Sequence, residues 1–406
     1  MKSSNSSEPS PNLDSSKLES PPTATSRLQP KKDSWWLLID PLLIVSTVAI
    51  LTLGLLLVYS ATRGDVGEFD IADKSFLYRQ ALFIVVGIGL AALAAFIKPV
   101  HLRQFWYLLY FLTIALLGLV LVLGVEVNGT RGWFTLGGFS FQPSEPTKLI
   151  LITGLALLKS PVGRQNKMVV GKMLKGLGVA IIPVVLVLMQ PDLGTALVYL
   201  VVVFAVVTVS GVKARWVLIL ALLAMLSMIV VFTSDILEDY QQARLTVFLF
   251  DIDEVPEAAA TYAYNAEQAQ IAIGNGGLLG QGLFKGTQTR SSLVPAQQTD
   301  FIFTVAGEEL GLRGAGALLG FYALLLFRIW RTAFLASSFF DRLICTGVFA
   351  MFSFQMFQAV GMTMGMMPVT GIPMPLVSYG GSSMLTSMVS LGLVVNVYRR
   401  RYQPLN

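Results

Sequence analysis

Long apolar segments recur along most of this sequence, and they set the strongest limit on how the chain can fold. The first runs from Trp35 to about Ser60, and further ones follow at about 79–97, 105–125, 147–158, 173–189, 194–211, 215–233, 301–327, 343–364 and 380–398. A helix crosses roughly 30 Å of hydrocarbon with about 20 apolar residues, whereas a barrel strand needs about ten residues of alternating polarity, which is not visible here. We therefore expect an all-α integral membrane protein, a bundle of about ten transmembrane helices.

The composition agrees with this class. Of the 406 residues, 54% are hydrophobic and only 13% are charged, and the mean hydropathy of +0.68 is far from that of a soluble globular chain. The single cysteine, Cys345, excludes an intrachain disulfide and is expected to be a small packing residue. With His101 as the only histidine, histidine-based metal sites and triads are excluded, and we expect no metal held by the protein alone.

The chain divides into a tail and a membrane domain. Residues 1–34 are rich in Ser, Pro and Thr and have no apolar face, so we expect a disordered cytoplasmic tail. Residues 35–402 form the polytopic domain, and its first apolar run has the full length of a retained span rather than that of a signal peptide. The segment 147–158 is too short to cross alone, so it either borrows the preceding QPSEPTK turn or is tilted and broken.

Charge indicates the orientation in the membrane. With the N-terminus inside, most of the 29 lysines and arginines fall in cytoplasmic segments, as positively charged loops should. Both termini are then cytoplasmic, and the long loop from about 234 to 300 is extracytoplasmic. Because topology accounts for the net charge of +5, no nucleic-acid partner is needed. Within the loop, residues 262–273 have helical composition and are followed by a glycine-rich stretch.

The stretch TQTRSSLVPAQQTDFIFTVAGEELGLR, residues 287–313, passes from a polar loop into an apolar span, and Asp300 stands at the junction. An ionisable residue at a membrane edge is first a functional candidate, with structural pairing as the alternative. Glu308 and Glu309 lie roughly 12 Å deeper along a helix. For these two a structural role is favoured, because Glu309 can pair with Arg313 at i,i+4 spacing.

Three further outward-facing segments carry polar groups. The first, residues 128–148, includes Glu145 and Lys148, which share a helix face and can simply pair. The second, residues 190–195, includes Asp192, for which capping of the next helix is the favoured role. The third, residues 368–383, is broken by Pro and Gly, and irregular backbone at membrane depth survives only when it is buried in protein or lines a wet cavity. Together the segments predict an outward-facing polar cavity over an apolar floor, suited to an amphiphile with an anionic head and a lipid tail.

At these residues the sequence resembles the SEDS family (shape, elongation, division and sporulation), which includes the RodA and FtsW proteins. The matching pieces are RGWFTLGGFSFQPSEPTK at 131–148, QPDLGTA at 190–196, Tyr240-Gln241 with Arg244, IAIGNGGLLGQGLFKGTQ at 271–288, QQTDFIFTVAGEELGL at 297–312 and PVTGIPMPLVSYGGSS at 368–383. The departures are modest. Gln298 replaces a frequent His, Pro146 interrupts a Ser-Glu-x-x-Lys piece, and Ala359 replaces a frequent Asn.

The resemblance implies a glycosyltransferase that polymerises lipid II into β-1,4 glycan strands at the outer face of the bacterial cytoplasmic membrane. Asp300 matches the family's essential aspartate and would be the general base in a single inverting transfer, with undecaprenyl pyrophosphate leaving. Candidate groups for binding the substrate are Arg131, Trp133, Glu145, Lys148, Asp192, Arg244, Lys285, Gln288, Ser378 and Tyr379. The pyrophosphate would be stabilised by cationic side chains, with Arg131 and Lys148 as the first candidates, or by a divalent ion, and any Mg²⁺ or Mn²⁺ would arrive with the substrate.

The resemblance also implies partners, and it leaves alternatives. The expected protein partner is a class B penicillin-binding protein, the transpeptidase that cross-links the strands, and membrane lipids surround the bundle. The alternatives are a lipid II flippase and a non-catalytic scaffold that activates a partner enzyme. The first would rest on internal repeats, and no repeat of residues 287–313 is seen. The short C-terminal tail favours the elongation branch typified by RodA over the division branch.

Overall fold

A computed structural model describes residues 39–63, 74–127, 129–137, 139–159, 170–233, 242, 244, 247, 248, 260–291 and 293–401. These residues belong to one compact unit. The expected tail at residues 1–34 and the start of the first span at Trp35 lie outside the described residues.

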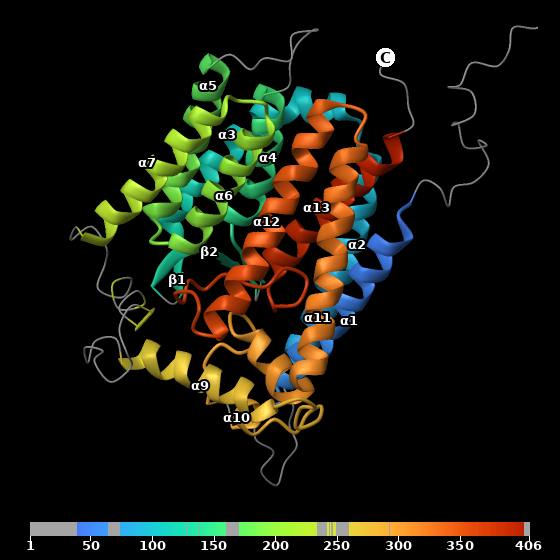
Figure 1. Cartoon of the computed structure of the whole chain (residues 1–406), viewed down its shortest axis with the longest axis vertical. Helices are drawn as coiled ribbons and strands as arrows, with labels where there is room; N and C mark the ends of the chain where they lie inside the picture. Colours follow the sequence, from blue (N-terminus) through green and yellow to red (C-terminus); the bar gives the residue numbers. More distant parts are fainter. Residues whose placement is uncertain are drawn as a thin grey trace, which may run out of the picture. The chain divides into compact units, whose positions relative to one another are not determined.

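Helices account for nearly all of the described architecture (Figure 1). They are α1 Pro41–Ala61, α2 Lys74–Phe96, α3 Pro99–Leu123, α4 Ser144–Lys159, α5 Val170–Leu188, α6 Leu193–Val209, α7 Ala214–Thr233, α9 Ala260–Gly276, α10 Thr287–Arg290, α11 Ile302–Leu335, α12 Phe339–Thr363 and α13 Gly381–Arg400. Six of the described helices, α1, α2, α3, α11, α12 and α13, are long and apolar enough to cross a membrane, and α6 and parts of α5 and α7 are shorter apolar helices. The predicted all-α membrane bundle is confirmed.

The short fourth apolar segment, predicted at about 147–158, forms the helix α4. It begins at Ser144, so the Ser-Glu-Pro-Thr-Lys part of the preceding turn forms its first turns and lengthens it to 16 residues. Pro146 lies in the first turn of this helix, where a missing backbone N–H costs little. The preceding turn therefore lengthens the fourth segment, which was one of the two expected alternatives.

Long-range packing holds the bundle together. The helix α13 packs along α2, and α11 packs against α1 and α12. At one end of the bundle, Asp40 caps α1 by accepting hydrogen bonds from the backbone N–H groups of Leu42 and Leu43. The same buried carboxylate accepts a hydrogen bond from Arg328 Nε of α11 at 2.7 Å, so the two helices share one compensated charge pair.

A break near the start of α11 shapes the packing around it. Gly311 has φ 64° and ψ −169°, so this helix consists of two pieces, residues 302–310 and 312–335. The glycine-rich segment after α9 fills the break. The backbone N–H groups of Gln281 and Gly282 donate to the carbonyl groups of Glu308 and Glu309 at 3.0 Å each. At Gly311 the left-handed backbone and the neighbouring Gly280 leave no room for a Cβ.

The predicted pairing of Glu309 with Arg313 is wrong, because helical i,i+4 spacing does not continue across Gly311. Among the described residues no ion pair joins these two side chains. Glu309 instead accepts a hydrogen bond from Ser60 Oγ of α1 at 2.6 Å. The helix predicted at residues 262–273 is confirmed as the centre of α9.

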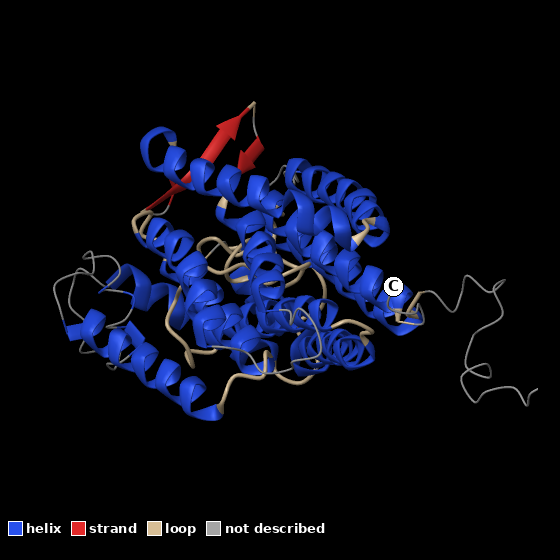
Figure 2. Cartoon of the chain, turned by 90° about the horizontal axis from the view of Figure 1, so that it is seen from above, coloured by secondary structure: helices blue, strands red, loops and turns tan. Residues whose placement is uncertain are grey.

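A small antiparallel sheet lies between α3 and α4, and the prediction of helices alone did not include it. Its strands are β1 Val125–Val127, β2 Thr130–Leu136 and β3 Phe139–Phe141, in the order β1-β2-β3. Figure 2 shows these strands at the edge of the helical bundle. The sheet forms one wall of the cavity described next.

Candidate functional site

A cavity of about 170 Å³ brings together the polar segments of the sequence. Its walls come from the β-sheet, the N-terminal turns of α4 and α6, the residues just before α11, and the segment before α13. The lining residues are Val127, Thr130, Trp133, Gln142, Glu145, Lys148, Asp192, Thr195, Arg244, Thr299, Asp300, Thr370, Gly371, Ile372, Pro373, Tyr379, Gly380, Ser382 and Ser383.

Asp300 is half-buried in a turn that leads into α11. Its backbone N–H donates to the carbonyl of Ala296 at 3.1 Å, and Ala296 itself has a φ of 53°. Burial raises the pKa of Asp300 to about 6, while the positive charge of Arg244 and the Thr299 hydroxyl act in the opposite direction. A carboxylate with this pKa is ionised at neutral pH and is a stronger base than an exposed aspartate.

Arg244 reaches the same point from the segment before α9. A Cβ built on Gly371 would lie 3.3 Å from Asp300 Oδ2 and 3.8 Å from Arg244 Nη1, so the two charged groups converge on this glycine. The guanidinium also lies over the ring of Tyr262, 5.2 Å from its centroid. Gly371 has a φ of 71° and leaves the space that both side chains use.

Lys148 and Glu145 form a buried ion pair on the first turns of α4. The distance from Lys148 Nζ to Glu145 Oε1 is 2.6 Å, and the lysine side chain is only 2% exposed. The predicted i,i+3 pairing is therefore confirmed, and both residues also line the cavity. Tyr199 of α6 fixes the start of α4, because its hydroxyl donates to the Ser144 carbonyl at 2.8 Å.

Asp192 combines the predicted capping role with a place in the cavity. Its Oδ1 accepts a hydrogen bond from the Thr195 backbone N–H at 2.9 Å, which caps α6. Its Oδ2 accepts a hydrogen bond from Gln142 Nε2 at 3.2 Å. Burial raises the pKa of Asp192, and the hydrogen bonds from Thr195 oppose that shift.

The segment from 368 to 383 closes the cavity on the side of α13. The Tyr379 backbone N–H donates to the Gln298 carbonyl at 2.8 Å, which ties this segment to the loop that carries Asp300. The Tyr379 ring contacts Phe76 and Phe83 of α2. Ser382 Oγ accepts a hydrogen bond from the Gln142 backbone N–H at 3.0 Å.

Seven of the candidate residues line the cavity, namely Trp133, Glu145, Lys148, Asp192, Arg244, Asp300 and Tyr379. Four do not. Arg131 is exposed on β2 opposite Glu126, and Lys285 is exposed before α10. Gln288 donates its backbone N–H to Glu308, and the buried Ser378 accepts a hydrogen bond from the Met374 backbone N–H. A substrate contact for these four stays a prediction.

Several lining residues were not singled out from the sequence. They are mainly amides and hydroxyls, and they include Gln142, Thr195, Thr299, Thr370, Ser382 and Ser383. All of them lie within the motif segments, so a position in a polar segment next to a break in a helix was the available signal. Among the described residues, no group of three or more His, Cys, Asp or Glu side chains is placed to hold a metal ion.

The fold and the cavity define a multi-pass helical membrane protein with a polar pocket, whose lining comes largely from the motif segments. The chain belongs to the family of FtsW, RodA and SpoVE, because the family profile described as "Cell cycle protein" matches residues 41–403. The family expected from the sequence is thereby confirmed.

Individual relatives agree with this assignment. Peptidoglycan glycosyltransferase MrdB of Escherichia coli K12 is 33% identical over 378 residues, which is 92% of this chain and 97% of the relative. The rod shape determining protein RodA of Thermus thermophilus superposes with a TM-score of 0.65 at 35% identity, covering 91% of this chain and 99% of that structure. A chain from a structure titled "Structural coordination of polymerization and crosslinking by a peptidoglycan synthase complex" gives a TM-score of 0.73 at 35% identity, covering 90% and 99%.

Proposed function

We propose that this protein is a peptidoglycan glycosyltransferase that polymerises lipid II into β-1,4 glycan strands. The observation that carries the proposal is the convergence of Asp300 and Arg244 on Gly371, in a cavity that also holds the Lys148–Glu145 pair. Membership of the FtsW, RodA and SpoVE family and the similarity to MrdB support the reaction class.

In this proposal Asp300 is the general base. A sugar hydroxyl is a poor nucleophile, so the acceptor 4-hydroxyl must lose its proton as it attacks the anomeric carbon of the donor. The raised pKa of Asp300, about 6, makes the carboxylate a better proton acceptor, and because it is still below neutral pH the group remains mostly ionised. Because the donor is α-linked and the product is β-1,4, a single inverting displacement needs only one such base.

Arg244 and Lys148 are the cations that line the described cavity, and they are the proposed contacts for the leaving undecaprenyl pyrophosphate. The same cavity holds the carboxyl groups of Asp300, Asp192 and Glu145. A pyrophosphate adds further negative charge to this set, which favours a divalent cation, Mg²⁺ or Mn²⁺, that arrives with the substrate. Arg131 and Lys285 lie outside the cavity, where they are proposed to act on the approaching substrate.

The proposed location is the bacterial cytoplasmic membrane, with the cavity at the outer face and both termini inside. Positive charge at the end of α13, in Arg399 and Arg400, supports a cytoplasmic C-terminus. Asp341 lies at that same end and pairs with Arg400 at 2.7 Å. The family includes proteins of both elongation and division, and the elongation branch is the one we favour.

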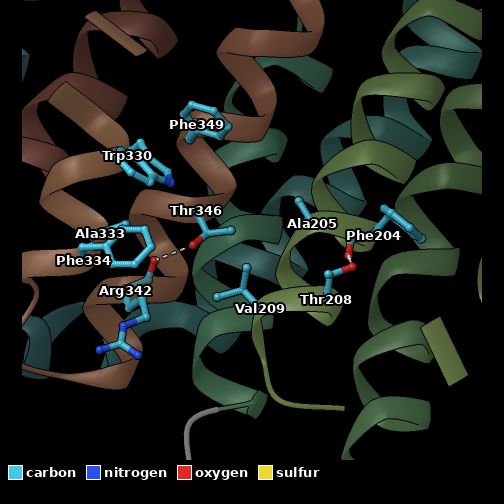
Figure 3. Close-up of a pocket in the computed structure, with 10 residues that line it drawn as sticks. All are labelled: Phe204, Ala205, Thr208, Val209, Trp330, Ala333, Phe334, Arg342, Thr346 and Phe349. Carbon is cyan, nitrogen blue, oxygen red and sulfur yellow. Dashed lines mark hydrogen bonds between the residues drawn. The ribbon is translucent and has the colours of Figure 1, made fainter. Parts of the chain in front are cut away.

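The proposed protein partner is a class B penicillin-binding protein, whose single membrane helix needs an apolar groove. Such a groove, with a volume of about 560 Å³, lies between α6, α11 and α12 (Figure 3). Its lining residues are Phe204, Ala205, Thr208, Val209, Trp330, Ala333, Phe334, Arg342, Thr346 and Phe349. The hydroxyls of Thr208 and Thr346 donate to carbonyls of their own helices at 2.8 and 2.9 Å, so the groove presents an apolar surface.

The test is polymerisation of purified lipid II by the purified protein, alone and with its partner transpeptidase. We expect polymer from the wild type and none from folded Asp300→Ala or Asp300→Asn. Full activity of Asp300→Asn would refute the assignment of Asp300 as the general base. Absence of polymer from wild type with its partner would favour the two other functions, a lipid II flippase or a scaffold, of which the flippase predicts transfer of lipid II across vesicles.

A further inference from the structure

Glu308 is a fully buried carboxylate that the proposed reaction does not use and that does not line the cavity. It lies in the short first piece of α11, before the break at Gly311. Burying a charge is costly unless hydrogen bonds replace its hydration. The partners of Glu308 therefore indicate what the charge is for.

Four donors from α10 surround this carboxylate. Glu308 Oε1 accepts hydrogen bonds from the Gln288 backbone N–H at 2.7 Å and from Thr287 Oγ1 at 3.2 Å. Glu308 Oε2 accepts hydrogen bonds from the backbone N–H and the hydroxyl of Thr289 at 2.9 and 2.7 Å. Gly286 permits the approach, because a Cβ there would lie 2.7 Å from Oε2. A single carboxylate thus fixes α10 onto the first piece of α11.

From α10 the contacts continue to Asp300. Gln297 Nε2 donates to the Gln288 carbonyl at 3.4 Å, and the Leu293 backbone N–H donates to the same carbonyl at 3.3 Å. The next turn closes on the Ala296 carbonyl, which accepts hydrogen bonds from the backbone N–H groups of Thr299 and Asp300 at 3.1 Å each. The loop is therefore held at its start by Glu308 and carries the proposed base at its end.

We propose that Glu308 is a positioning residue, which fixes α10 and through it the loop 293–300, so that the Asp300 carboxylate is held in the cavity beside Arg244. This inference rests on the proposed function for the role of Asp300. The anchoring itself rests only on the contacts of Glu308 with α10. Since charge-assisted hydrogen bonds are stronger than neutral ones, a carboxylate suits an anchor that must hold an irregular loop in one conformation.

The test uses Thr289→Val, which removes one donor to Glu308 and keeps the size of the side chain, Thr289→Ser, which keeps the hydroxyl, and Glu308→Gln. The matched control is Thr52→Val, because the exposed Thr52 of α1 donates its hydroxyl only to the Val48 carbonyl of its own helix. Two measurements are made on each protein with its partner transpeptidase. The first is hydrogen–deuterium exchange of residues 287–300, and the second is lipid II polymerisation as a function of pH.

We expect faster exchange in residues 287–300 for Thr289→Val and Glu308→Gln, and wild-type exchange for Thr289→Ser and the control. We also expect kcat to fall roughly tenfold in Thr289→Val, with KM within about twofold, since the base is displaced while substrate contacts remain. The acid limb of kcat/KM should move from about 6 toward the ordinary aspartate value of about 3.9, because a loosened loop exposes Asp300 to water.

If hydrogen–deuterium exchange of residues 287–300 is unchanged in Glu308→Gln, then Glu308 does not anchor α10, whatever the activity of the variant. Faster exchange with an unchanged kcat and pH profile overturns the positioning role. If wild type makes no polymer, the proposed function fails, and the positioning role of Glu308 in catalysis fails with it. The exchange data then still test whether Glu308 anchors α10.

Discussion

Asp300 acquires its properties from neighbours that are distant in the sequence. Arg244 stabilises its charge and burial opposes it, and burial prevails, so the pKa rises from 3.8 to about 6. Asp192, Glu145 and Lys148 are the other charged groups that line the same cavity. The resulting pKa of about 6 is close to neutral pH, where a general base is most effective.

The rate of polymerisation should therefore depend on pH through Asp300. We expect kcat/KM to fall as pH decreases through about 6, because protonation removes the base. The measurement is initial rate against pH, at lipid II concentrations below KM. A rate that stays flat down to pH 4.5 would contradict the assignment.

The same shift predicts a change in stability. The folded-state pKa of Asp300 lies above its unfolded value, so the ionised group destabilises the fold above pH 6, and this penalty disappears below pH 4. We expect Asp300→Asn to be more stable than wild type at pH 7.5, by about 1–3 kcal/mol. Thermal unfolding in detergent at pH 7.5 and pH 4 measures the difference in stability between the variant and wild type. An equal difference at both pH values would count against burial of the charge as the cause.

The Lys148–Glu145 pair makes a separate prediction. Removing one partner of a buried pair leaves an uncompensated charge, so Lys148→Met should cost about 3–5 kcal/mol. The double variant Lys148→Met/Glu145→Gln should recover most of that stability and remain inactive, because the cation for the pyrophosphate is absent. Thermal unfolding and polymer assays on both single variants and the double variant test this. Activity in the double variant would assign the pair a structural role alone.

Among the elements, α11 differs most from a regular membrane helix. Its break at Gly311 is filled by the backbone of the segment after α9, which satisfies groups that a broken helix leaves unpaired. The first piece carries Glu308, and the second piece continues across the bundle. The break thus separates the part of α11 that carries Glu308, next to the loop of the proposed base, from the longer apolar part.

Gly311→Ala should lower Tm and abolish polymerisation, because its φ of 64° disfavours a side chain and Gly280 occupies the space a Cβ would need. The matched control is Gly316→Ala in the same helix, where a Cβ would meet nothing within 4 Å. The control should be neutral or more stable by up to about 1 kcal/mol. Equal behaviour of the two variants would show that the break is dispensable.

Across the whole molecule, polar and apolar sites are kept apart. The cavity lies where the sheet and the irregular segments meet, whereas the groove lined by Trp330 and Phe349 lies between helices. Both are made by elements that are distant in the chain. A polar cavity and a separate apolar groove fit the two proposed roles, glycosyl transfer and binding of a membrane partner.

Filling the groove should weaken binding of the partner and leave the isolated protein folded. Ala205 lines the groove, and Ala205→Trp would occupy its space. Ala92→Trp is the control, at an exposed position of α2. We expect copurification with the transpeptidase to be lost in the first variant and kept in the second. Retention in both would place the partner's helix on another face.

The features that could be predicted from the sequence are those that depend on local chemistry. The helices follow from apolar length, the Asp192 cap from its place before α6, and the Lys148–Glu145 pair from spacing on one helix. The pairing of Glu309 failed because its spacing assumed a continuous helix. That Arg131 and Lys285 are exposed and do not line the cavity depends on packing that no local pattern records.

The apolar runs alone require a helical membrane bundle, since lipid offers the backbone no hydrogen bonds and helices satisfy their own. The motif segments alone indicate where polar groups enter that bundle. Folding in three dimensions selects which of those groups meet. Asp300 and Arg244 converge on Gly371, because a residue without a side chain leaves the space for both. Glu308 reaches the backbone of α10, because Gly286 permits a close approach between two segments that are separate in the chain.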